Sequence, residues 1–165
     1  MTPETALCET VRFTAQRFEA YSSESGFDPW VVTGGVLMAQ QAAVLALRAA
    51  GDAIPAQAGG TELLLRAASK DRLPAPFTLP FGAAARQSFD RLVEARNAFM
   101  HPRGALWHVS ADTLSRAMPV ATRTVRHLIV IQPVLDDLVT PDQQAALQAD
   151  LNAIEAMAEF IAAPY

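Results

Sequence analysis

Residues 29–47 form one uncharged run, PWVVTGGVLMAQQAAVLAL, which constrains the fold more than any other feature of the sequence. A helix of this length that is apolar nearly all round needs apolar surroundings, either a protein core or a lipid bilayer. Gln40 and Gln41 at the centre, the adjacent Gly34 and Gly35, and the lack of a lysine or arginine cluster on either flank argue against a membrane span. We therefore expect the central helix of a soluble bundle and no membrane partner.

Cys8 is the only cysteine of the chain, so the sequence allows no intramolecular disulfide and no cysteine-based zinc site. The first twenty residues carry charges throughout and lack the basic start and apolar run of a secretory signal. We expect a cytoplasmic protein, and the length fits a single domain over residues 1–165.

The remaining sequence also shows helical spacing of apolar residues, and no stretch alternates apolar and polar residues convincingly. The sequence therefore predicts an all-α fold, an up-down bundle of four to five helices. Helices are expected over about residues 4–22, 28–50, 61–69, 82–101 and 110–139, and from about residue 140 onward.

Capping residues mark several helix starts. Asp28, Thr61 and Ser110 are each expected to accept a hydrogen bond from the first turn of a helix, and Thr140 with Gln143 resembles a capping box. These signals predict where helices begin without any information about packing.

Prolines and glycines mark interruptions. Pro119 and Pro133 are expected to kink or restart the helix that contains them, and residues 71–80, with three prolines, are expected to form a loop. Gly34 and Gly35 favour a kink or a close contact between helices.

The net charge of −4 is unevenly distributed. Residues 66–127 carry ten basic and four acidic residues, a local balance of +6, whereas the rest of the chain sums to −10. This asymmetry is compatible with one phosphate-facing surface on an acidic protein, and equally with charges that solvate ordinary helix faces. The overall acidity argues against a strong non-specific nucleic-acid binder.

The stretch EARNAFMHPRG places Arg96 five positions before His101, next to a proline and a glycine that stop the helix. The spacing alone is weak, because Arg103 and His108 repeat it. Asn97 directly after the arginine makes the pattern more specific, with a chance expectation of roughly a few in a thousand.

A helical wheel at about 100° per residue puts Arg96 in the middle of the apolar face of its helix. The polar edge beside that face, between about 80° and 140° from Phe89, holds Asp90, Glu94, Asn97 and His101. An arginine in that position is costly unless its guanidinium has a partner.

Two explanations remain open for Arg96. In the structural one, Arg96 forms an ion pair with an acidic residue of another helix, and His101 interacts with the last carbonyls of its own helix. In the functional one, Arg96 binds a phosphate, His101 transfers protons and Asn97 orients the imidazole. Such a set suits metal-independent RNA cleavage, in which the 2′-hydroxyl of the substrate is the nucleophile. His101 lies about 140° from Arg96, so the helix must open at its end if both are to face one phosphate.

The sequence RNAFMH, on an arginine-bearing helix of an all-α chain, resembles the signature of the HEPN superfamily, an arginine, commonly a polar residue, and a histidine four to six positions beyond. The resemblance implies a bundle of four or five helices that dimerises, so that two motif copies share one cleft. It implies a metal-independent ribonuclease of a toxin–antitoxin, defence or RNA-processing system. A small nucleotidyltransferase is a frequent neighbour in the family and is the expected type of antitoxin partner.

Under this hypothesis the protein is a homodimeric endoribonuclease that acts on RNA and needs neither cofactor nor metal. The alternative is a non-catalytic HEPN-like module that binds a nucleotide, an RNA or a protein partner. The predicted catalytic residues are Arg96, Asn97 and His101. The predicted substrate-binding residues are Arg91, Arg103 and His108.

Overall fold

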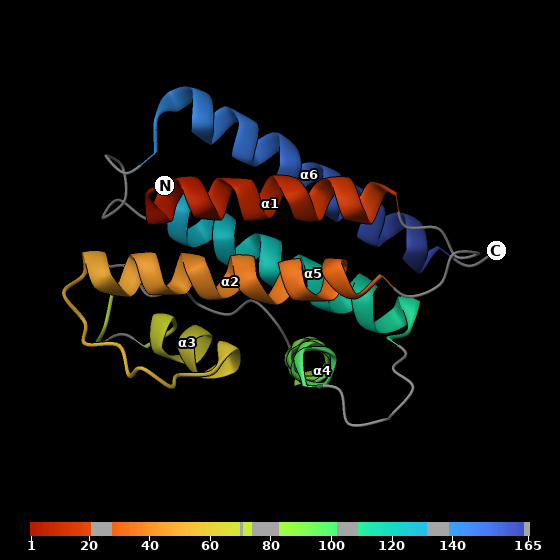
Figure 1. The fold of residues 1–165 in the computed structure, drawn as a ribbon, viewed down its shortest axis with the longest axis horizontal. Coiled ribbons are helices and arrows are strands. Elements are labelled where there is room, and N and C mark those ends of the chain that lie inside the picture. Colours follow the sequence, from red (N-terminus) through yellow and green to blue (C-terminus); the bar gives the residue numbers. More distant parts are fainter. Residues whose placement is uncertain (21–27, 70, 74–82, 102–108, 132–138, 164–165) are drawn as a thin grey trace.

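The computed structural model describes residues 1–20, 28–69, 71–73, 83–101, 109–131 and 139–163. The described part of the chain contains helices and no strands, which confirms the all-α prediction (Figure 1). The described residues form six α-helices, so the predicted number of four to five is too low. The helices are α1 (Pro3–Glu19), α2 (Pro29–Ala49), α3 (Gly60–Ala67), α4 (Ala83–Met100), α5 (Ala111–Val125) and α6 (Pro141–Ala162), with a π-helical segment, η1 (Arg126–Ile131), directly after α5.

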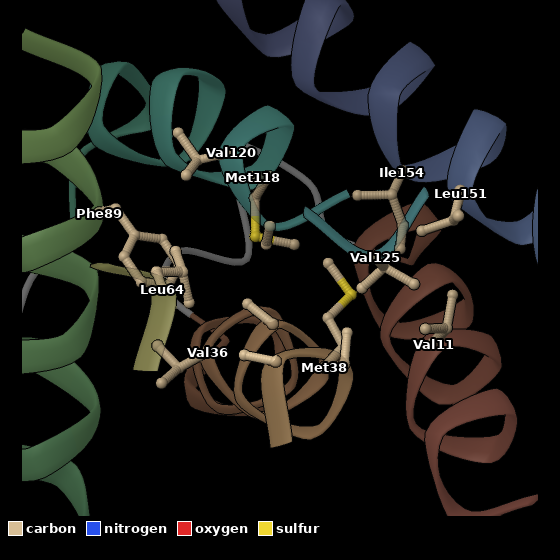
Figure 2. Packing of buried hydrophobic residues seen from close by; sticks show 14 of the residues in the cluster. Val11, Val36, Met38, Leu64, Phe89, Met118, Val120, Val125, Leu151 and Ile154 are labelled. Atoms are coloured by element: carbon tan, nitrogen blue, oxygen red, sulfur yellow. The ribbon is translucent and has the colours of Figure 1, made fainter. Parts of the chain in front are cut away.

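Helix α2 lies at the centre, as its apolar sequence predicts. It packs against α1, α3, α4 and α5, and its residues from Val31 to Leu47 supply much of the buried core. In Figure 1, α1 and α2 run antiparallel across the view, whereas α4 is seen along its axis and crosses them. Figure 2 shows Val36 and Met38 of α2 surrounded by side chains of the neighbouring helices.

Gly34 and Gly35 allow two helices to approach α2 closely. A Cβ atom at Gly34 would lie 2.1 Å from Oγ1 of Thr14 on α1, and one at Gly35 would lie 2.6 Å from Sδ of Met118 on α5. Real Cβ atoms do not come this close to another atom, so both positions require glycine while the neighbours stay where they are. The close helix contact expected from the sequence is confirmed.

Among the helices described, α2 alone is long and apolar enough to cross a membrane, with a mean hydropathy of 1.5. Of its most apolar window, 67% is buried inside the protein, the pattern of a core helix.

Three of the four predicted caps are confirmed. Asp28 accepts from the Trp30 amide at 2.8 Å, Ser110 caps α5, and Thr140 forms a full capping box at the start of α6. The prediction for Thr61 is wrong, because α3 begins one residue earlier with Gly59 as its N-cap.

Of the kink or restart expected at Pro119, the restart does not occur, because α5 includes this residue in one helix from Ala111 to Val125. Only residues 71–73 of the expected loop over residues 71–80 are described, and Pro133 lies outside the described residues.

Candidate functional site

Helix α4 carries the motif and packs across α2. Phe89 and Leu92 are buried, and Leu92 lies beside Gly35 of α2, 3.4 Å from the position of a Cβ there. Phe89 points towards Leu64 of α3 in Figure 2. Asp90 accepts a hydrogen bond of 2.6 Å from the Thr61 hydroxyl and so ties α4 to α3. The middle of α4 is thereby fixed against the core.

The apolar face of α4 extends beyond the core. Val93, Arg96 and Phe99 are half-buried, and Met100 is 53% exposed. Arg96 therefore lies in the apolar face of α4, as predicted. The rest of the protein covers this face only partly around residue 96. Arg96 sits where the packed part of the helix gives way to solvent.

The partner of Arg96 is a carboxamide. Its Nη2 donates to Oε1 of Gln40 on α2 at 3.2 Å. No salt bridge to Arg96 forms within the described residues, so the ion pair that the structural explanation required is not present there. In the sequence, Gln40 argues only against a membrane span, and its local pattern does not indicate a contact with Arg96.

Asn97 and His101 lie at the exposed C-terminal end of α4. The His101 amide donates to the Asn97 carbonyl at 3.0 Å, which closes an ordinary last helical turn. The helix is therefore not open at the His101 amide, as it would have to be for His101 to turn towards Arg96. Arg96 and His101 are not joined by a hydrogen bond among the described residues, and the helical register leaves them about 140° apart.

Of the three predicted substrate-binding residues, the structure describes one. Arg91 is exposed on α4, whereas Arg103 and His108 lie outside the described residues. The structure therefore places one of the three on the motif helix, on a side about 140° from Arg96.

Four of the ten basic residues between residues 66 and 127 form internal ion pairs. Arg66 and Arg72 bind Asp52, Arg116 binds Asp112, and Arg126 binds Glu155. The basic residues of α4 are Arg86, Arg91 and Arg96, and no described carboxylate forms a salt bridge with them.

The part of α2 beside Arg96 is not fully covered, contrary to the expectation of a helix buried all round. Leu37 is 40% exposed and separates two apolar grooves that run along α1 and α2. One, of about 330 Å³, is lined by Phe13 and Trp30, and the other, of about 310 Å³, by Gln40. Exposed Trp30 also meets Phe99 of α4 edge to face, with 5.6 Å between ring centroids.

Among the described residues, no group of three or more histidine, cysteine, aspartate or glutamate side chains is arranged to hold a metal ion. No model of a known protein family matches the chain, and no curated protein or solved structure matches it either.

Proposed function

We propose that this chain is an HEPN-like, metal-independent endoribonuclease that works as a homodimer. The observation that carries the proposal is the state of Arg96. It is half-buried at the edge of the core and bonds a neutral carboxamide, and no carboxylate of the described residues forms a salt bridge with it. A guanidinium kept in this way is suited to bind a phosphate.

In the proposed reaction, the 2′-hydroxyl of RNA attacks the adjacent phosphorus and loses its proton to a base. The bond from phosphorus to the 5′-oxygen breaks, and that oxygen takes up a proton. The products are a 2′,3′-cyclic phosphate and a 5′-hydroxyl. His101 acts as the general acid or base, Asn97 orients its imidazole, and Arg96 stabilises the charge on the pentavalent phosphorus.

A homodimer supplies what one chain lacks. Because Arg96 and His101 project from different sides of α4, a single phosphate is contacted more readily by Arg96 of one protomer and His101 of its partner. The arrangement proposed here is an HEPN-like helical bundle in which two copies of the motif share one cleft. Arg91, Arg103 and His108 would contact flanking phosphates.

The setting proposed is a cytoplasmic toxin–antitoxin or defence system, with a nucleotidyltransferase-type antitoxin as the partner.

The test is RNA cleavage in the presence of a chelator. Wild-type protein is expected to release fragments with cyclic-phosphate ends, and His101→Ala should lower the rate by at least about 100-fold while the thermal unfolding curve is unchanged. Arg96→Ala should also be inactive. Its control is Arg48→Ala, at an exposed arginine near the end of α2, which should cleave RNA at the wild-type rate. Equal activity of wild type and His101→Ala would remove His101 from the mechanism.

The second candidate is a non-catalytic HEPN-like module that binds a nucleotide, an RNA or a protein partner. The register of α4 favours it, since the helix ends with Arg96 and His101 on different sides. Saturable binding of RNA by wild type, without fragments after prolonged incubation, would favour this function over the enzyme.

A further inference from the structure

Gln40 lies where three helices meet. It comes from the middle of α2, accepts a hydrogen bond from Arg96 of α4, and lies close to the start of α3 at Gly60. A Cβ at Gly60 would lie 3.3 Å from Nε2 and 3.4 Å from Cγ of Gln40, and 3.4 Å from Cγ2 of Val93. A side chain at residue 60 would therefore crowd the Gln40 carboxamide slightly, and the glycine avoids this.

The surroundings of Gln40 restrain the carboxamide that Arg96 uses. Gln40 is half-buried on α2, the central helix of the core, and a half-buried side chain has fewer rotamers open to it than an exposed one. Its hydrogen bond therefore links the Arg96 side chain, which has many rotamers, to the rigid helix α2.

The chemistry of the amide matters as much as its position. A carboxylate at residue 40 would form a charge-assisted pair with Arg96 and cancel most of its field. The carboxamide oxygen accepts one N–H and leaves the net charge intact. A guanidinium has five N–H donors, and the hydrogen bond to Gln40 uses one of them.

We infer that Gln40 is a positioning residue for Arg96: it fixes the guanidinium at the edge of α2 and leaves its charge and remaining donors for a phosphate of RNA. This inference rests on the proposed function for its ligand. Its geometry, the contact of Gln40 with Arg96, stands independently of that function and is tested separately.

The first test compares Gln40→Glu with Gln16→Glu, a matched change at an exposed glutamine of α1. Gln40→Glu should weaken RNA binding about tenfold and make the slope of log affinity against log salt shallower by about one, because one phosphate contact is lost. Its melting temperature should equal or exceed that of wild type, since an ion pair replaces a hydrogen bond from the guanidinium to an uncharged acceptor. Gln16→Glu should leave the salt slope unchanged. A Gln40→Glu protein with wild-type affinity and salt slope would overturn the inference.

The second test needs no RNA. The Nε–Hε signal of Arg96 in an NMR spectrum of ¹⁵N-labelled protein reports how firmly the guanidinium is held. Gln40→Met keeps most of the side-chain volume but lacks the acceptor oxygen, so it should broaden or shift this signal and speed its exchange with water. An unchanged Arg96 signal in Gln40→Met would show that Gln40 does not position the guanidinium.

The two tests separate the inference from the proposed function. If wild-type protein neither binds nor cleaves RNA, the proposed function fails, whereas a changed Arg96 signal in Gln40→Met would still establish the positioning contact. If wild type cleaves RNA and both Gln40 variants behave as wild type, the positioning role fails and the proposed function remains.

Discussion

At the scale of single residues, Asp52 shows how basic residues of the middle segment are used internally. It follows α2, and its side chain is 6% exposed. The carboxylate binds both Arg66 of α3 at 2.9 Å and Arg72 at 2.7 Å. Burial alone would raise the pKa of the Asp52 carboxyl, but the hydrogen bonds and charges of the two arginines outweigh it and hold the pKa below its ordinary value. The carboxylate thus fastens the connection after α2 to α3.

The pH dependence of stability follows from the lowered pKa of Asp52. A carboxyl whose pKa is lower in the folded state contributes stability above its ordinary pKa, and this contribution is lost as the pH falls through the folded pKa. Asp52→Asn should therefore be less stable than wild type between about pH 5 and pH 7, and the difference should shrink below about pH 4. Urea unfolding at a series of pH values measures this difference.

Asp112→Asn is the matched control for Asp52→Asn. Asp112 pairs with Arg116 within one helix, and its side chain is 63% exposed, so its loss should change stability little at any pH. A constant difference between wild type and Asp52→Asn from pH 3 to pH 7 would contradict the assignment of the pKa shift.

At the scale of helices, the contact of α1 with α2 depends on a missing side chain at Gly34. Thr14 is fully buried opposite it and donates its hydroxyl to the Thr10 carbonyl at 2.7 Å, so it has little freedom to move away. Gly34→Ala should destabilise the protein by about 1–3 kcal/mol, because the added methyl group forces α1 away from α2. The free energy of unfolding in urea tests this.

Gly59→Ala serves as the control for Gly34→Ala. Nothing lies within 4 Å of a Cβ at Gly59, and its φ of −75° suits any residue, so the cost should be limited to that of alanine as a poorer N-cap, about 0.5–1 kcal/mol. The double variant Gly34→Ala with Thr14→Ala should recover part of the loss. Equal effects of the two single glycine changes would show that α1 and α2 do not meet as closely as described.

At the scale of the whole molecule, the proposed composite cleft can be tested by mixing two inactive variants. Arg96→Ala and His101→Ala should each be inactive alone. If one phosphate is contacted by Arg96 of one protomer and His101 of its partner, a mixed dimer has one intact site. With random exchange of subunits, RNA cleavage should return to about a quarter of the wild-type rate.

Size-exclusion chromatography with light scattering, run on the same mixture, checks that dimers are present. Absence of recovery in a mixture shown to contain mixed dimers would mean that both side chains must come from one chain. That outcome would require α4 to open beyond the last turn closed by the His101 amide.

The sequence by itself determined the all-α class, the central place of α2 and three of the four predicted helix starts. Each of these depends on local chemistry. An N-cap such as Asp28, Ser110 or Thr140 needs only the amides of the next turn, and an uncharged run must be buried wherever the fold places it. The sequence also singled out Arg96, because periodicity alone shows that a charge lies in an apolar face.

Only the tertiary structure decided what those residues meet. The hydroxyl of Thr61 bonds Asp90, far away in sequence, while α3 starts at a glycine. Arg96 meets Gln40 and no described carboxylate, a choice set by how α4 crosses α2. Contacts between residues separated by 29 and 56 positions depend on the packing of whole helices, which no local pattern encodes.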